Sequence, residues 1–179
     1  TPIIGIAGWK KSGKTTLTVR LVEEFTRRGF AVATVKHAHH AFQIDDADTD
    51  SARHRRAGAG QVAIVSSERW AIVAELRGAP EPDFADVISR LEPADLIIVE
   101  GYKSAPIPKI EARRSVSLTH TPLSETDPRV IAIAADFAIA DRRLPAFALD
   151  DIGAIADFID RSVGPLRPRP PGPKAGGRG

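Results

Sequence analysis

Short hydrophobic runs along the chain alternate with segments in which apolar residues recur every three or four positions. The first pattern is typical of buried strands, and the second of amphipathic helices. Strands are predicted at residues 3–7, 31–35, 61–65, 70–74, 96–99, 130–134 and 146–149, and residues 109–113 form either a strand or an extended return. The first two runs start about 30 residues apart with a helical segment between them, which is the spacing of a βαβ unit. The pattern therefore predicts an α/β fold with a mostly parallel central sheet.

One connection is too short for a parallel crossover. Only residues 66–69 separate the runs 61–65 and 70–74, so these two strands are predicted to form an antiparallel hairpin and to make the sheet mixed. Helical segments follow residue 14, residue 51 (with Asp50 or Ser51 as its cap), Asp83, and Asp150 or Asp151. With helices between most strands, we expect helices on both faces of the sheet.

The composition is that of an ordinary globular chain. Its 179 residues, 42% of them hydrophobic, suit one domain, which we place at residues 1–163. Ten of the sixteen residues 164–179 are Pro or Gly, so this segment is predicted to be a disordered tail. The tail holds four basic residues and no acidic one, which leaves the rest of the chain with a formal charge of −2. This balance argues against nucleic acid as a partner.

Two features of the composition narrow the function further. The chain has no cysteine, which excludes disulfides, thiolate zinc sites and cysteine nucleophiles. No run approaches the roughly 18 apolar residues of a membrane-spanning helix, and we expect no signal peptide before the first strand. We therefore expect a cytoplasmic protein without a membrane partner.

The segment between the first strand and the first helix carries the clearest motif. Residues 8–15 fit the phosphate-binding loop G-x-x-x-x-G-K-[ST] in its strand–loop–helix context. The N–H groups of such a loop, together with the helix N-terminus, surround phosphate groups. The predicted phosphate contacts are Gly8, Trp9, Lys10, Lys11, Ser12, Gly13, Lys14, Thr15 and Thr16. Lys14 is expected to reach the β- and γ-phosphates as a catalytic residue, and Thr15 to ligate Mg²⁺.

The most apolar run of the chain, residues 96–99, ends in Glu100. This pattern predicts a Walker B strand whose terminal carboxylate, Glu100, faces the magnesium site and contributes to catalysis. Gly101 would let the backbone approach the γ-phosphate. Further along, Lys103 and Lys109 are candidates for contact with an anionic ligand or with a partner chain.

A polar segment follows the second strand, and it would lie beside the phosphate loop if the first two strands were neighbours. It contains His37, His39 and His40, followed by Asp45, Asp46, Asp48 and Asp50. Candidate nucleotide-contacting or partner-contacting residues here are His37 and His40, although imidazole with carboxylate also suits zinc or nickel. Arg53 opens a cationic group at residues 53–56, which suits either a phosphate-rich ligand or a solvated helix face.

Asp136 ends an apolar strand late in the chain. Guanine-reading loops use an aspartate at such a place to accept from N1–H and the 2-amino group of the base. The residues before Asp136, Ile133-Ala134-Ala135, are not the Asn/Thr-Lys pair that is usual in GTPases. Asp136 is therefore a candidate guanine contact, and the sequence leaves the choice between GTP and ATP open.

Four segments together resemble one family. They are the loop 8–16, Val35-Lys36-His37 with His40, the run from Asp50 to Ala59, and Ile98 to Lys103 with Pro108 to Glu111. They resemble the molybdopterin-guanine dinucleotide biosynthesis adaptor family, MobB, over residues 3–159. The resemblance implies a P-loop NTPase fold, GTP and Mg²⁺ as ligands, weak GTPase activity at most, and a homodimer. The implied partners are the molybdenum cofactor guanylyltransferase, which joins GMP to molybdopterin, and molybdopterin itself.

The resemblance also assigns roles within the site. Residues 8–16 would hold the GTP phosphates, Glu100 would lie by magnesium, and the segments around His37 and Arg53 would face the cofactor or the partner. Two alternatives stay open. One is a metallochaperone GTPase that loads nickel or another metal through the His37–Asp50 segment. The other is a small-molecule P-loop kinase, which would need an Arg-bearing lid over the phosphates.

Overall fold

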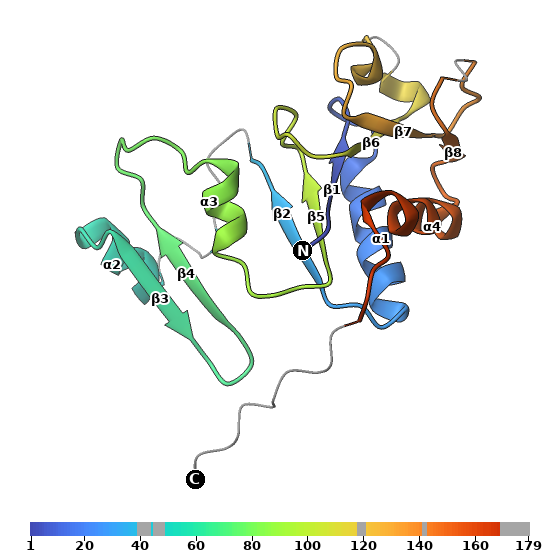
Figure 1. The fold of residues 1–179 in the computed structure, drawn as a ribbon. Coiled ribbons are helices and arrows are strands. Elements are labelled where there is room, and N and C mark those ends of the chain that lie inside the picture. The colour runs from blue at the N-terminus through green and yellow to red at the C-terminus, as the bar shows by residue number, and fades with distance from the viewer. Residues whose placement is uncertain (39–43, 45–48, 118–120, 141–142, 169–179) are drawn as a thin grey trace. The chain divides into compact units, whose positions relative to one another are not determined.

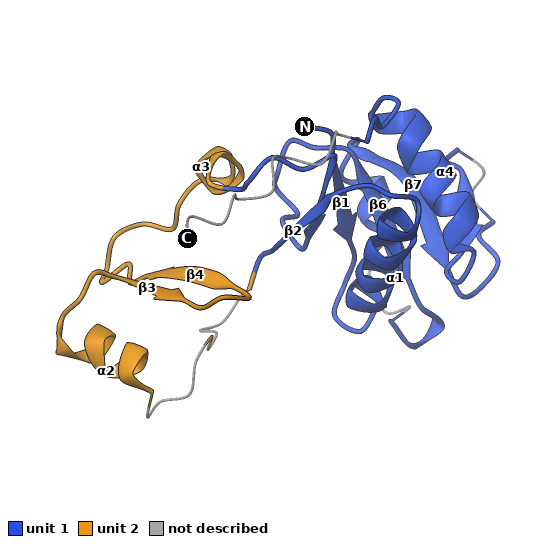
Figure 2. Cartoon of the chain, turned by 90° about the horizontal axis from the view of Figure 1, so that it is seen from below, with its two compact units in different colours: residues 1–37, 91–179 blue, residues 38–90 orange. Residues whose placement is uncertain are grey.

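The structure, a computed structural model, describes residues 1–38, 44, 49–117, 121–140 and 143–168 (Figure 1). The chain forms two compact units, which Figure 2 shows in separate colours. The first unit comprises residues 1–37 and 91–179, and the second comprises residues 38–90. The second unit is therefore inserted into the first along the sequence.

Six strands form the sheet of the first unit. They are β1 (Ile3–Ala7), β2 (Val32–Lys36), β5 (Leu96–Glu100), β6 (Lys109–Arg113), β7 (Val130–Ala135) and β8 (Ala146–Ala148), in the order β2-β5-β1-β6-β7-β8. All neighbouring pairs in this sheet are parallel. The predicted α/β fold is confirmed, and residues 109–113 form a strand rather than an extended return.

The hairpin strands β3 (Gln61–Val65) and β4 (Trp70–Ala74) form a separate two-stranded antiparallel sheet in the second unit. The antiparallel hairpin is confirmed, but the prediction of one mixed sheet is wrong. The short connection determines only that β3 and β4 pair with each other, and in the described part of the chain neither pairs with the parallel strands.

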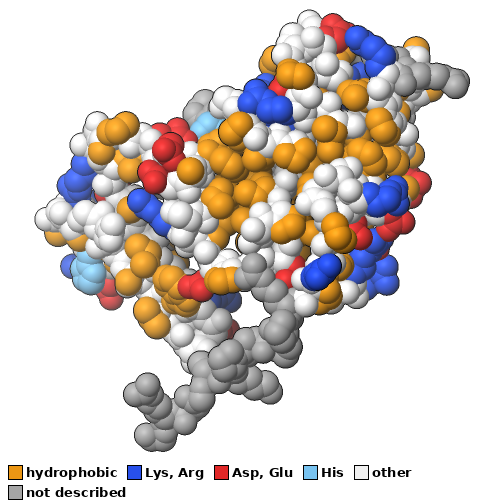
Figure 3. Space-filling model, viewed as in Figure 1, with side chains coloured by type: hydrophobic (Ala, Val, Ile, Leu, Met, Phe, Trp, Pro, Cys, Tyr) orange, Lys and Arg blue, Asp and Glu red, His pale blue; other side chains and the backbone are white. Residues whose placement is uncertain are grey.

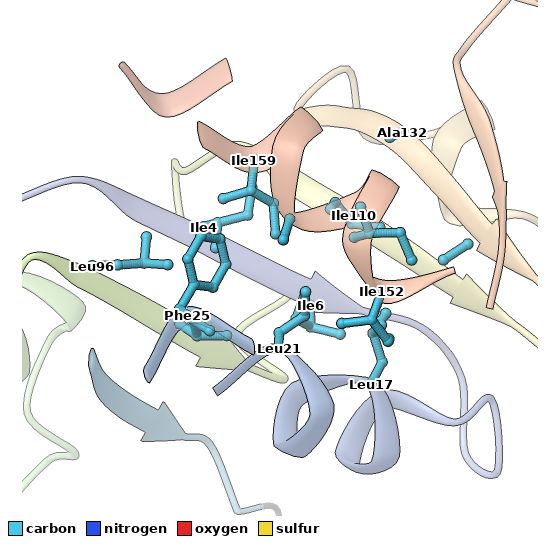
Figure 4. Packing of buried hydrophobic residues seen from close by; sticks show 14 of the residues in the cluster. Ile4, Ile6, Leu17, Leu21, Phe25, Leu96, Ile110, Ala132, Ile152 and Ile159 are labelled. Atoms are coloured by element: carbon cyan, nitrogen blue, oxygen red, sulfur yellow. The ribbon is translucent and has the colours of Figure 1, made fainter. Parts of the chain in front are cut away.

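Two helices, α1 (Lys14–Arg27) and α4 (Ile152–Val163), pack on one face of the parallel sheet. They are the α-helices of this unit among the described residues, so the prediction of α-helices on both faces of the sheet is wrong here. The side chains that they bury toward Ile4 and Ile6 of β1 are Leu17, Leu21 and Phe25 from α1, and Ile152 and Ile159 from α4 (Figure 4). Ile155 of α4 belongs to the same buried cluster. Burial of each such side chain contributes about 1.5–3 kcal/mol. This core holds α1, and with it the loop that precedes α1, in a fixed position on the sheet.

The end of α4 continues into the same core. Asp151 caps the helix by accepting a hydrogen bond from the Ala154 N–H at 3.2 Å, as one of the two predicted caps. After the helix, the Leu166 side chain is buried in the cluster, and the Leu166 N–H donates to Asp160 Oδ1 at 2.7 Å. The first residues of the predicted tail therefore pack against the core.

The opposite face of β6 is polar, buried and covered by connecting segments. Lys109, only 1% exposed, donates from Nζ to Ala105 O at 2.8 Å and to Asp127 Oδ2 at 2.7 Å. Glu111 accepts from the N–H groups of Leu123 and Ser124, at 2.8 and 3.0 Å. Leu123 and Ser124 are the first residues of the 3₁₀ helix η2 (Leu123–Glu125), so these hydrogen bonds hold η2 over this face. A second 3₁₀ helix, η1 (Ser115–Ser117), follows β6 in the sequence. The interpretation of Lys109 as a contact for an anionic ligand is wrong, because Asp127 already pairs with its ammonium group.

The second unit contains two short helices beside the hairpin. Thr49 caps α2 (Asp50–Ala57) by accepting from the Ala52 N–H at 3.3 Å, so the prediction of Asp50 or Ser51 as the cap is wrong by one or two residues. Asp83 caps α3 (Phe84–Ser89) as predicted, through a 2.8 Å hydrogen bond from the Asp86 N–H. Among the described residues, none of the helices has the length and apolar character needed to span a membrane.

Candidate functional site

The loop between β1 and α1 has a backbone that only glycine tolerates at two places. Gly8 has φ of 150° and Gly13 has φ of 90°. A Cβ atom at Gly8 would meet Ser12 Oγ and would lie 2.6 Å from Ala112 O. Lys11, with φ of 65°, also adopts the left-handed conformation. The loop therefore has the tight curl in which successive N–H groups converge on a phosphate.

The buried hydroxyl of Ser12 supports this interpretation. Ser12 is 1% exposed, and its Oγ has no hydrogen-bond partner among the described residues. Buried polar groups are nearly always paired in folded proteins, so an unpaired hydroxyl inside this loop marks a place where a polar ligand fits.

Two side chains that follow the loop carry its chemistry. Lys14 Nζ donates to the carbonyl of Trp9 at 2.7 Å, and Thr15 Oγ1 donates to Glu100 Oε1 at 2.7 Å. Burial lowers the pKa of Lys14, while the Glu100 carboxylate raises it and the nearby Lys103 and Lys36 ammonium groups lower it further. Thr15 and Glu100 are 85 residues apart in the sequence, and both are predicted metal ligands. The fold brings their side chains into direct contact.

The strand order explains which residues reach this place. β5 lies between β1 and β2, so the first two strands are not neighbours, and the residues that follow β5 lie next to the loop. The carboxyl end of β2 nonetheless reaches Glu100, since the His37 N–H donates to Glu100 O at 2.9 Å and Lys36 Nζ lies 3.6 Å from Glu100 Oε1. Gly101 has φ of 103°, and a Cβ atom added to it would lie only 3.2 Å from His37 O. A side chain at position 101 would therefore crowd His37.

An aromatic pair and a cation–π contact lie among the residues that follow β1, β2 and β5. The rings of His37 and Tyr102 stack with centroids 4.5 Å apart. Lys103 Nζ lies 3.7 Å from the centroid of the Trp9 ring, and Trp9 Nε1 donates to Thr121 O at 2.8 Å. Of the predicted loop residues, Lys10, Lys11, Thr15 and Thr16 are exposed, whereas Gly8 and Ser12 are buried.

A cleft of about 790 Å³ opens on the β7–β8 side of the loop. It is lined by Gly13 and Thr16 from the loop and α1, by Asp136 and Phe137 after β7, and by Leu149 after β8. The Asp136 carboxylate accepts from the Ser115 N–H at 2.7 Å and lies 3.4 Å from Arg114 Nε. Asp136 therefore stands in a pocket of nucleoside size, next to the phosphate loop, with its orientation fixed by residues that follow β6.

Some predicted site residues are not brought together by the described structure. His40, with the candidate ligands His39, Asp45, Asp46 and Asp48, lies outside the described residues. Arg53 is an exposed residue of α2 in the second unit, where its Nη1 lies 3.7 Å from Asp50 Oδ1. Within the part of the chain that the structure describes, no group of three or more His, Asp or Glu side chains could hold a metal ion.

Sequence reasoning missed several residues of the cleft. Arg114 and Arg20 line it, and Arg20 donates to Asp150 O at 3.1 Å. The segment 146–150 also contributes, and it consists of β8 and the two residues that follow it. The position of Leu149 and Asp150 after a parallel strand was a usable signal, because ligands bind beyond the carboxyl ends of such strands. No spacing in the sequence relates Arg20 or Arg114 to Asp136, since only the fold brings α1 near the end of β6.

A parallel sheet with this loop between its first strand and first helix defines a P-loop NTPase fold. A crystal structure of molybdopterin-guanine biosynthesis protein B (MobB) has this fold, with a TM-score of 0.67 and 28% identity over 88% of this chain and 97% of the other. The Bacillus subtilis MobB structure, at 24% identity, also has it, with a TM-score of 0.70 over 94% of this chain and all of the other.

Sequence comparison then identifies the family. Residues 3–136 match the family model "MobB: Molybdopterin guanine dinucleotide synthesis protein B". The molybdopterin-guanine dinucleotide biosynthesis adapter protein of Haemophilus influenzae is 40% identical, over 89% of this chain and 88% of its own length. The adapter protein of Escherichia coli is 33% identical, over 88% of this chain and 91% of its own length. The chain belongs to the MobB family of molybdenum cofactor biosynthesis.

Proposed function

We propose that this protein is a GTP-binding adapter that assists the attachment of GMP to molybdopterin. The observation that carries the proposal is the contact between Thr15 and Glu100 at the end of the phosphate loop. A cleft of nucleoside size lies next to this loop. The loop would hold the phosphates, and the cleft would hold the base and ribose. In this arrangement Lys14 exchanges its bond to Trp9 O for bonds to phosphate oxygens, which are stronger because both partners are charged.

The residues at the Thr15–Glu100 contact fit magnesium. A hydroxyl and a carboxylate oxygen 2.7 Å apart are the hard oxygen donors that this ion takes, alongside phosphate oxygens and water. When bound, Mg²⁺ neutralises charge on the phosphate chain. Glu100 itself is held in position by its burial at the end of β5. We expect hydrolysis to be slow, so the bound nucleotide serves recognition more than turnover.

The proposed partners follow from the family. The curated relatives are named adapter proteins of molybdopterin-guanine dinucleotide biosynthesis, and an adapter acts on other proteins of its pathway. We propose the guanylyltransferase that makes the guanine dinucleotide as the partner, with molybdopterin as a further ligand, in the cytoplasm.

Base selectivity tests this function directly. Calorimetric titration in Mg²⁺ is expected to show GTP binding at least tenfold tighter than ATP, a difference of about 1.4 kcal/mol. In Asp136→Ala the preference is expected to fall below threefold, because the acceptor for the guanine N1–H and 2-amino groups is lost. Arg161→Ala on the exposed surface of α4 serves as the control and should keep the preference. Equal affinity for ATP and GTP in the unmodified protein would contradict the guanine assignment.

We further propose that the protein forms a homodimer through its hairpin. A two-stranded sheet is marginally stable on its own. Val62 and Val73 are buried on one face of this hairpin, whereas Val65, Trp70 and Ile72 on the other are 75%, 60% and 56% exposed. Figure 3 shows hydrophobic side chains at the surface of this hairpin. A second copy of the chain would bury this apolar face.

Disruption of this face is expected to give monomers. Ile72→Glu places a charge in the centre of the proposed contact, and light scattering after gel filtration should then report the mass of one chain. Val116→Glu is the matched control, because Val116 is 68% exposed in the first unit, away from the hairpin in sequence. The dimer proposal fails if the unmodified protein is monomeric, or if Ile72→Glu remains dimeric at the same concentration.

A further inference from the structure

Two lysine ammonium groups meet at one residue of the phosphate loop, Trp9. Its carbonyl accepts from Lys14 Nζ at 2.7 Å, and its ring lies 3.7 Å from Lys103 Nζ. The indole N–H donates to Thr121 O at 2.8 Å, which fixes the orientation of the ring. Lys103, although it belongs to the segment after β5, is thereby held directly against the loop.

The charges around this point are unbalanced. The ammonium groups of Lys36 and Lys103 both lie close enough to Lys14 to lower its pKa, and the described carboxylate that acts on Lys14 and lies beside Lys36 is Glu100. Burial lowers the pKa of Lys103, as it does that of Lys14. Grouped like charges in a partly buried place repel one another, so the group is stabilised by an anion that carries several negative charges.

The strand order indicates which end of a nucleotide this group would meet. In the order β2-β5-β1-β6-β7-β8, the loop follows β1, and the cleft with Asp136 lies on the β7–β8 side. Glu100, Lys36 and Lys103 lie at or after the ends of β5 and β2, on the other side of the loop. A nucleotide with its base in the cleft would therefore extend its phosphate chain toward β5. The terminal phosphate would come next to the Thr15–Glu100 contact and Lys103.

We propose that Lys103 moves from the face of Trp9 onto the terminal phosphate of the bound nucleotide and makes the site select a triphosphate over a diphosphate. This inference rests on the proposed nucleotide binding. The exchange is favourable because a charge-assisted hydrogen bond to phosphate is stronger than a cation–π contact. The four-carbon stem of lysine allows the ammonium group to move without a backbone change.

The test compares two nucleotides on the same variants. With Mg²⁺, Lys103→Ala is expected to bind a non-hydrolysable GTP analogue about tenfold more weakly than the unmodified protein, and GDP within about twofold. Lys103→Arg, which keeps the charge, should retain most of the triphosphate preference. Arg161→Ala removes one positive charge from α4 and should change neither affinity.

Trp9 provides a second readout. The chain has two tryptophans, so in a Trp70→Phe background the fluorescence reports Trp9 alone. The GTP analogue should change the emission by removing the ammonium group from the ring, GDP should change it much less, and Lys103→Ala should remove the difference. If the unmodified protein binds neither nucleotide, the proposed function fails. If it binds both but Lys103→Ala keeps the triphosphate preference, only the role of Lys103 is overturned.

Discussion

Lys14→Ala is expected to weaken GTP binding by roughly 100-fold or more, a loss of about 2.8 kcal/mol. Lys14 supplies the charge that the loop directs at the β- and γ-phosphates from the first turn of α1. The neighbouring cations Lys36 and Lys103 approach from the ends of β2 and β5, so neither replaces it at that position. Calorimetric titration with GTP and Mg²⁺ measures the effect.

The fold of this variant should be unaffected. The Lys14 ammonium contacts only Trp9 O among the hydrogen bonds described, and its side chain lies outside the core cluster. Thermal unfolding without nucleotide should therefore match the unmodified protein, whereas the stabilisation by GTP should disappear. GTP binding within threefold of the unmodified protein would contradict the assignment of the phosphate site to this loop.

Lys109→Met is expected to destabilise the protein by about 3–5 kcal/mol without a direct effect on the nucleotide site. The variant removes the 2.7 Å ion pair with Asp127 and leaves the largely buried Asp127 carboxylate with Arg129 as its remaining cation among the described residues. Urea unfolding at pH 7 measures the loss. Arg129→Met, which removes the more exposed partner, should cost less, about 1 kcal/mol.

A second variant separates lost charge pairing from lost packing. Lys109→Met combined with Asp127→Asn should recover part of the stability, because the largely buried carboxylate that has lost its lysine partner is then replaced by a neutral amide. If the double variant is no more stable than Lys109→Met alone, the ion pair is not the source of the loss.

The pH dependence of stability provides a second test of the ion pair between Lys109 and Asp127. Burial raises the pKa of Asp127, but hydrogen bonds from Lys109 and Arg129 outweigh it and lower the pKa from 3.8 to about 2. Because the folded-state pKa is depressed, this stabilisation is complete above the unfolded-state value and is lost as the pH falls toward 2. Lys109→Met should therefore show a shallower loss of stability between about pH 4 and pH 2 than the unmodified protein.

The local sequence determined the kind and place of most elements. Hydrophobic runs and helical spacing depend on neighbouring residues alone. The predicted bounds of the strands β1, β3, β4 and β5 therefore agree with the observed ones to within one residue, and α4 begins at a predicted cap. The phosphate loop was also a local feature, because its curl follows from glycines at fixed positions. For the same reason, Glu100 could be predicted from the end of one apolar strand.

Only the tertiary structure decided which strand ends meet. The sequence pattern of β1 and β2 is the same whether they are neighbours or, as here, separated by β5, since strand order depends on packing between distant segments. The fold likewise buried Lys109 against Asp127, placed Lys103 on Trp9 and brought Arg114 to Asp136. Charged side chains carry no local signal of burial or pairing, so the sequence by itself determined the loop that receives a phosphate, and the fold determined the cations and the cleft around it.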